Sequence, residues 1–143
     1  MRLLLPILFM ILSFLSIVSC NNKVTKTRQA DLVVEYNGTK IAASGPSWTS
    51  YDELIRDLDN DEKTFILFAA TWCRPCGRVL KIAKQEGWLK KIKVINADVN
   101  WVQYFMQESG INSIPSMIVV DKDGSDRLIV GPSKIVTYLV IHL

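Results

Sequence analysis

Two cysteines three residues apart could form and break a disulfide reversibly in this 143-residue chain. Cys73 and Cys76 lie in the segment Trp72-Cys73-Arg74-Pro75-Cys76, directly after the apolar run 65–70. The apolar run predicts a buried strand, and the residues after it predict a helix whose amino end holds the first sulfur. Unpaired backbone N–H groups and the helix macrodipole favour a thiolate over a thiol there. The motif therefore predicts thiol–disulfide exchange.

The rest of the chain predicts alternating strands and helices around this motif. Asn37-Gly38 between two short apolar runs predicts a hairpin over 32–41. Ser50 and Glu53 form a capping box, which predicts a helix that ends near 59–61. Further strands are expected at 92–99, 116–120 and 127–130, and further helices at 73–87, at 101–108 and after 133. The apolar sides of the first and last helix are assigned to Leu54, Ile55, Leu58, Ile135, Val136, Leu139 and Val140. This order of elements predicts a three-layer α/β domain with a mixed sheet.

The amino-terminal segment predicts export. Residues 1–19 combine Arg2 with an uncharged apolar run, which is typical of a secretory signal peptide. A retained transmembrane anchor is the alternative, although the run is close to the shortest that spans a bilayer. Residues 20–30 are polar and lack apolar periodicity, so they predict a flexible tether. The folded domain is then expected over 31–143.

The end of the apolar run resembles the lipobox of bacterial lipoproteins. Ile17-Val18-Ser19-Cys20 has the aliphatic, small and cysteine positions of that pattern. The resemblance implies that Cys20 receives diacylglycerol and becomes the mature amino terminus, anchored by more than one acyl chain. The alternative is that Cys20 merely belongs to the apolar segment. If Cys20 carries lipid, the remaining cysteines form one exchanging pair and none is left over.

The charge balance and the histidine count exclude other classes of function. Seventeen basic and 14 acidic residues give a net charge of +3, which is too weak an imbalance to indicate nucleic-acid binding. The single histidine, His142, has no ligand partners nearby in the sequence, and no second cysteine pair completes a zinc site. We therefore expect no metal, and no cofactor besides the redox-active disulfide Cys73–Cys76.

From about Trp48 to Leu143, the chain resembles thioredoxin. The resemblance depends on three motifs at the family's spacing: Trp72-Cys73-x-Pro75-Cys76 after a buried strand, Gly110-Ile111-x-x-Ile114-Pro115 before a strand, and Lys122-Asp123-Gly124 with Val130-Gly131 before the final helix. It implies a thioredoxin fold, which is a three-layer α/β/α domain with a central mixed β-sheet.

The resemblance also implies the roles of the residues at the site. Cys73 is the nucleophile and Cys76 the resolving thiol, acting through a mixed disulfide. Pro115 is the family's cis-proline, because only an X–Pro bond adopts the cis form cheaply. The backbone of Ile114 then lies beside the active sulfur and pairs with the substrate chain.

Three further residues of the motif are expected at the substrate-binding surface. Trp72 would shield one side of the cysteine pair and contact the substrate, with simple packing as the alternative. Pro75 keeps the helix start rigid. Arg74 replaces the glycine of typical thioredoxins; it would stabilise the Cys73 thiolate and make the pair more oxidising, or remain solvated with little effect.

Two departures from the family pattern concern proton transfer. Thioredoxins have a buried aspartate six residues before the first cysteine, where this chain has Leu67, and the lysine that partners it is replaced by Val94. The carboxylates nearby in the sequence are Glu86, Asp98 and Glu108, and the sequence favours none of them as the proton acceptor for Cys76.

Together these features predict a lipid-anchored thiol–disulfide oxidoreductase of the bacterial cell envelope. Its partners would be exported proteins with disulfides or dithiols and a membrane electron donor or acceptor, because the compartment is oxidising. Family members with proline before the second cysteine are mostly reductants, so Pro75 favours reduction. The alternative is a binding module that uses the Cys73–Cys76 disulfide as a structural link without turnover.

Overall fold

The computed structural model describes residues 32–43, 45, 48–58 and 62–143. The expected signal peptide at 1–19, the lipidation site Cys20 and the tether at 20–30 lie outside these residues, so those expectations remain predictions. In the part of the chain that is described, no helix has both the length and the apolar character needed to cross a bilayer.

The described residues form six strands, four α-helices and one short 3₁₀ helix, and the order confirms the predicted alternation. The strands are β1 (Leu32–Tyr36), β2 (Thr39–Ala43), β3 (Thr64–Ala69), β4 (Ile92–Asn96), β5 (Ser116–Val120) and β6 (Asp126–Val130). The helices are α2 (Tyr51–Leu58), α3 (Arg74–Gln85), η1 (Trp88–Lys90), α4 (Asn100–Glu108) and α5 (Pro132–His142).

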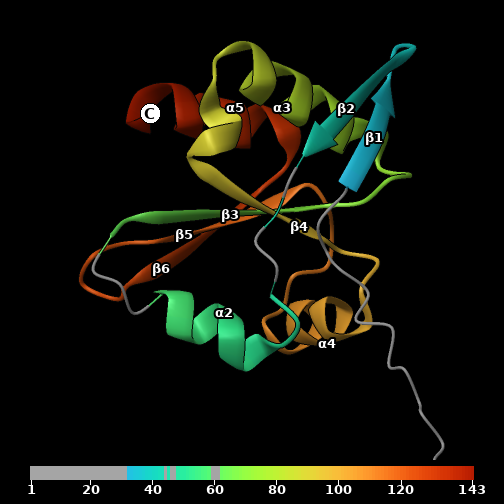
Figure 1. Cartoon of the computed structure of the whole chain (residues 1–143). Helices are drawn as coiled ribbons and strands as arrows, with labels where there is room; N and C mark the ends of the chain where they lie inside the picture. The colour runs from blue at the N-terminus through green and yellow to red at the C-terminus, as the bar shows by residue number, and fades with distance from the viewer. Residues whose placement is uncertain (1–31, 44, 46–47, 59–61) are drawn as a thin grey trace, which may run out of the picture.

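Four strands form a central mixed sheet in the order β4-β3-β5-β6. β3 and β4 are parallel, whereas β5 is antiparallel to β3 and β6 is antiparallel to β5. Helices α3 and α5 lie on one face of this sheet, and α2 and α4 lie on the other (Figure 1). The predicted three-layer α/β/α architecture with a mixed sheet, which is the thioredoxin fold, is therefore confirmed.

Strand β3 contributes to the hydrophobic core on both faces of the sheet. Phe65, Leu67 and Ala69 pack in the cluster on the side of α3 and α5, whereas Ile66 and Phe68 pack in the cluster on the side of α2 and α4. Successive side chains of a strand point to opposite faces, so a uniformly apolar run is required where both faces are covered. This is the physical reason for the run that precedes the cysteines.

The two amino-terminal strands form a separate antiparallel hairpin that packs on α3 (Figure 1). Its turn residues Asn37 and Gly38 have φ angles of 50° and 75°, as the Asn-Gly pair predicts. The close approach requires a glycine in the helix: a Cβ on Gly77 would lie 2.7 Å from Tyr36 Cβ and 3.2 Å from Val34 Cγ1. The hairpin therefore covers the helix directly after Cys76.

The structure corrects the expected length of β4. The strand ends at Asn96, not near 99, because the N–H of Ala97 donates to the Ala69 carbonyl and the chain then turns, with the N–H of Val99 bonded to the Asn96 carbonyl. Val99 precedes α4 as its N-cap. This turn moves residue 98 from the sheet to its edge.

Two apolar residues that were assigned to buried helix faces are exposed. Ile55 in α2 is 37% exposed, and Val140 in α5 is 64% exposed. In α5, Ile135 and Leu139 are fully buried and mark the line that faces the sheet. Val140 is one residue beyond Leu139 and thus about 100° further around the helix, which turns it towards solvent.

Candidate functional site

The two cysteines form a disulfide at the amino end of α3, with an S–S distance of 2.04 Å. Cys73 is the N-cap of the helix: it has extended backbone angles (φ −81°, ψ 92°), and its Sγ accepts a hydrogen bond of 3.2 Å from the N–H of Cys76. The N–H of Cys73 donates to the carbonyl of Ala70 in the preceding turn. The first sulfur therefore lies where unpaired N–H groups of the helix favour negative charge.

The exposure of the two cysteines differs slightly. Cys73 is 3% exposed and Cys76 is fully buried. Arg74 and Pro75 are the first two residues of α3, and both are exposed. Of the two cysteines, only Cys73, the expected nucleophile, has any surface exposed to solvent.

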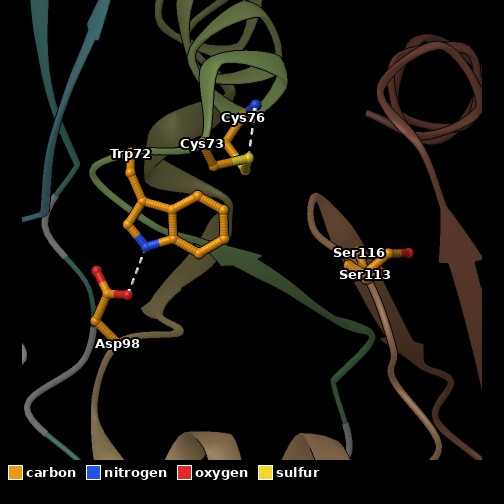
Figure 2. Close-up of a disulfide and its surroundings, with 6 residues drawn as sticks. All are labelled: Trp72, Cys73, Cys76, Asp98, Ser113 and Ser116. Carbon is orange, nitrogen blue, oxygen red and sulfur yellow. Dashed lines mark hydrogen bonds between the residues drawn. A yellow bond between two sulfur atoms is a disulfide. The ribbon is translucent and has the colours of Figure 1, made fainter.

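A hydrogen bond holds Trp72 beside the disulfide. Its Nε1 donates to Asp98 Oδ1 at 2.7 Å, and Figure 2 shows the indole extending between Asp98 and the cysteines. The carboxyl ends of the parallel strands β3 and β4 bring the two residues together, because the N–H of Ala97 is bonded to the Ala69 carbonyl. Trp72 is 70% exposed, so it forms a wall at the surface and is not part of the core.

A cavity of about 330 Å³ opens next to this wall. Its lining combines apolar side chains with uncharged polar side chains, and the one charged group among these residues is a carboxylate. Its lining residues are Trp72, Ala97, Asp98, Gln103, Met106, Gln107, Ile111, Asn112, Ser113 and Ile114. The cavity combines apolar groups with hydrogen-bonding groups, as ligand sites in proteins do.

The loop that leads into β5 borders the same cavity. The peptide bond between Ile114 and Pro115 is cis, as the resemblance implies. Pro115 is buried and Ile114 is half-buried. Two hydrogen bonds fix the loop: Ser116 Oγ donates to the Ser113 carbonyl at 2.5 Å, and the N–H of Gly131 donates to the Pro115 carbonyl at 3.0 Å. The structure therefore brings Ile114 and Pro115 to the same site as the cysteines and Trp72.

The region beneath the disulfide is apolar. Leu67 and Val94, which occupy the positions of the family's aspartate and lysine, are partners across the parallel pair β3–β4, and Met117 is paired with Leu67 on its other side. All three are buried and pack in the same cluster as Cys73 and Cys76. The two departures noted in the sequence are thus one local change, in which an apolar pair replaces a charged pair.

The structure separates the three carboxylates that were considered for proton transfer. Asp98 lies at the site through its bond to Trp72, whereas Glu86 is the C-cap of α3 and Glu108 ends α4. Asp98 lies two residues after the end of β4, and this position just beyond a parallel strand was the signal that could have singled it out. Ser116 was not identified from the sequence, because a serine after a proline gives no chemical signal of its own.

No group of three or more histidine, cysteine or acidic side chains within the described ranges is arranged to hold a metal ion.

Comparison with protein-family models identifies the family of this chain. The thioredoxin family model matches residues 46–139, which include β3, the two cysteines, the loop before β5 and most of α5. The hairpin β1–β2 lies before the matched range. None of the curated protein sequences matches the chain.

Solved thioredoxins are similar in structure. Thioredoxin from Malassezia sympodialis is 26% identical with a TM-score of 0.50, and the match covers 65% of this chain and 88% of that protein. Thioredoxin from Trypanosoma brucei brucei has a TM-score of 0.53 at 17% identity, covering 69% of this chain and 88% of that protein. Oxidised thioredoxin from Plasmodium falciparum has a TM-score of 0.50 at 23% identity, with 66% and 94% covered.

Proposed function

Since this chain belongs to the thioredoxin family, we propose that it is a protein thiol–disulfide oxidoreductase of the bacterial cell envelope that reduces disulfides in exported proteins. The fold and the spacing of the cysteines support thiol oxidoreductase chemistry in general. The observation that carries the proposal is the Cys73–Cys76 disulfide at the amino end of α3, beside the cavity that Trp72 and Ile114 border.

The proposed reaction transfers two electrons from the reduced cysteine pair to the substrate. The Cys73 thiolate attacks one sulfur of the substrate disulfide, whose S–S bond breaks and leaves a substrate thiolate. The Cys76 thiol then loses its proton and attacks the Cys73 sulfur in the mixed disulfide. The second substrate sulfur leaves as a thiolate, and the Cys73–Cys76 disulfide is restored. Each substrate thiolate takes up a proton.

The proton of Cys76 has no acidic acceptor at the position where the family has one. Leu67 and Val94 are both buried there. A buried cysteine in apolar surroundings ionises less readily than an exposed one. We therefore assign the release of the mixed disulfide as the step in which this chain departs most from the typical family member, since water or another group must accept the proton.

The proposed location and partners follow from the amino-terminal sequence and the compartment. A lipid on Cys20 would hold the domain at the membrane, on its periplasmic or outer face. An oxidising compartment returns any reductase to its disulfide form, so the pair needs electrons from a membrane donor. Pro75 supports reduction of substrates as the direction of the reaction. Arg74 is exposed beside Cys73, and if it stabilises the thiolate it raises the reduction potential of the pair and makes it more oxidising.

The second candidate function is a binding module without turnover. The buried apolar pair Leu67–Val94 favours it, because efficient resolution of a mixed disulfide requires proton removal from Cys76. In that case, the disulfide links the turn to α3, and the cavity beside Trp72 holds a partner segment.

A redox equilibrium titration of the full chain in mild detergent tests the proposal. The pair is followed by thiol alkylation in dithiothreitol and glutathione buffers. We expect a reduction potential near about −270 mV, the value typical of thioredoxin. A value near about −120 mV indicates an oxidant and reverses the proposed direction. A pair that does not exchange with either buffer overturns the enzyme and supports the binding module.

A further inference from the structure

We propose that Ser116 is a positioning residue that fixes the register in which an extended substrate segment pairs with the chain at Ile114. The inference rests on the proposed function, because it concerns how the same site holds a protein disulfide. It is carried by the hydrogen bonds of the loop 113–116.

Ser116 is an unusual residue for its place in the sheet. It begins β5 and lies between Phe68 of β3 and Val130 of β6. Among the described residues, it is the polar residue that is fully buried. A buried hydroxyl costs free energy unless it is hydrogen-bonded. Its Oγ meets this requirement by donating to the Ser113 carbonyl at 2.5 Å.

The hydroxyl does not serve the disulfide directly. In Figure 2, Ser113 and Ser116 lie together and apart from Cys73 and Cys76, whereas the indole of Trp72 lies beside the two cysteines. The hydrogen bond from Ser116 Oγ to the Ser113 carbonyl links the start of β5 back to the loop. Its effect is therefore on the conformation of the residues between, which are Ile114 and Pro115.

The hydrogen bonds of the loop leave one residue able to pair fully with another strand. The Ser113 carbonyl accepts from Ser116 Oγ, and the Pro115 carbonyl accepts from the N–H of Gly131. Proline has no N–H to donate. Neither backbone group of Ile114 has a hydrogen-bond partner among the described residues. In an antiparallel pair, the two opposed residues exchange both an N–H and a C=O bond. Within the loop 113–116, Ile114 is the residue whose N–H and C=O are both without another bond.

The register of this pairing determines where the substrate sulfur lies. A shift of one residue turns every side chain of a strand to the opposite face. A substrate that paired at Ser113 would thus direct its cysteine away from Cys73. By taking one of the two acceptor sites of the Ser113 carbonyl and fixing its orientation, Ser116 disfavours that register and directs an extended segment to Ile114, next to the cavity bordered by Trp72.

A matched pair of variants tests the inference: Ser116→Thr and Ser116→Val. The two side chains have the same shape, and only threonine retains the hydroxyl, so any crowding by the added methyl group is common to both. The full chain is reduced, freed of reductant and mixed with either insulin, a protein disulfide, or dithiobis-nitrobenzoate, a small disulfide that has no backbone to pair. The limiting rate and the half-saturating concentration are measured in single turnovers.

We expect Ser116→Val to raise the half-saturating concentration for insulin roughly three- to tenfold relative to Ser116→Thr, since one hydrogen bond contributes about 0.5–1.5 kcal/mol. The ratio of insulin to small-disulfide reactivity should fall by the same factor. Rescue by threonine distinguishes positioning from packing. Equal losses for both disulfides in Ser116→Val, or equal behaviour of the two variants, overturn the inference while the proposed function stands. A wild-type chain that reduces neither disulfide overturns the proposed function, and the inference with it.

Discussion

The indole nitrogen of Trp72 and a carboxylate oxygen of Asp98 are 2.7 Å apart, although 26 residues separate them in the sequence. The bond joins the end of β3 to the end of β4 and holds the exposed indole between the disulfide and the cavity. An exposed tryptophan without such a bond would sample several rotamers, and ordering it on binding would cost free energy. The bond therefore prepares the surface on which we place the substrate.

Asp98→Ala should weaken the binding of a protein disulfide. Without the acceptor, the Trp72 side chain is released, and we expect the half-saturating concentration for insulin to rise by about two- to fivefold, the effect of one exposed charge-assisted hydrogen bond. Asp98→Asn is the matched control, since its amide oxygen can still accept from the indole. Steady-state insulin reduction measures both variants. If the half-saturating concentration rises equally in the two variants, the charge of Asp98 and not the hydrogen bond is responsible.

Cys76→Ser should trap the substrate in a mixed disulfide. With Cys20 replaced by serine in every variant, Cys73 can still attack in Cys76→Ser, but no second thiol is present to release the product, so a covalent adduct accumulates while turnover falls to background. Cys73→Ser should form no adduct, because the remaining thiol belongs to the fully buried Cys76. Non-reducing electrophoresis and mass spectrometry of the full chain measure this. Equal trapping by the two variants would contradict the assigned order of attack.

Gly77→Ala should destabilise the domain, although alanine is the better helix former by about 1 kcal/mol. The added Cβ would lie 2.7 Å from Tyr36 Cβ, so the hairpin β1–β2 must move away from α3. We expect a net loss of about 1–3 kcal/mol in the free energy of unfolding, the usual cost of overpacking. Urea denaturation measures it. Lys84→Ala, at an exposed position of the same helix, serves as the control and should change stability little. If Gly77→Ala leaves the free energy of unfolding unchanged, the hairpin is not held tightly on the helix.

The turn between β5 and β6 should contribute a small pH dependence. Ser125 donates from its Oγ at 2.6 Å and from its N–H at 2.9 Å to Asp123 Oδ1, and these bonds lower the pKa of the Asp123 carboxyl below its ordinary value of about 3.8. Because the pKa is lower in the folded state, the stabilisation is present above the ordinary value and is lost as pH falls through the lowered value.

Ser125→Ala tests this assignment, because it removes the larger of the two contributions. We expect the pKa of Asp123, followed by carboxyl carbon NMR, to rise towards its ordinary value, with the backbone N–H of Ser125 still holding it slightly low. The loss of stability on acidification should then still begin near the ordinary value, but it should be smaller and be complete at a higher pH. An unchanged pKa would assign the shift to the backbone bond alone.

Much of the fold is predictable from the sequence because its signals are local. The Asn37-Gly38 turn requires positive φ angles, and the hairpin forms there. The apolar run before the cysteines is long enough to fill both faces of a sheet, and β3 is buried on both. The position of Cys73 at a helix amino end follows from these neighbours alone, so the candidate chemistry was also a local prediction.

Local signals were less successful at the margins of the elements. The apolar pattern extended β4 to Val99, whereas a turn bonded to β3 ends the strand at Asn96. The pattern also assigned Val140 to a buried face that α5 does not present to the sheet. In both cases, the pattern records which residues are apolar, while contacts with other elements decide where a strand ends and which side of a helix is covered.

The spacing of the cysteine pair and the order of strands and helices could be predicted from the sequence, because each depends on residues within a few positions of one another, where backbone geometry and hydrophobic periodicity act directly. The family resemblance needed three such local motifs at their spacing along the chain. The tertiary structure was needed to show that Asp98 holds Trp72, that Leu67 lies against Val94 beneath the disulfide, and that Ser116 is bonded to the loop before Ile114. These relationships depend on strand register and on the turns at the ends of the strands, which are set when the whole sheet packs.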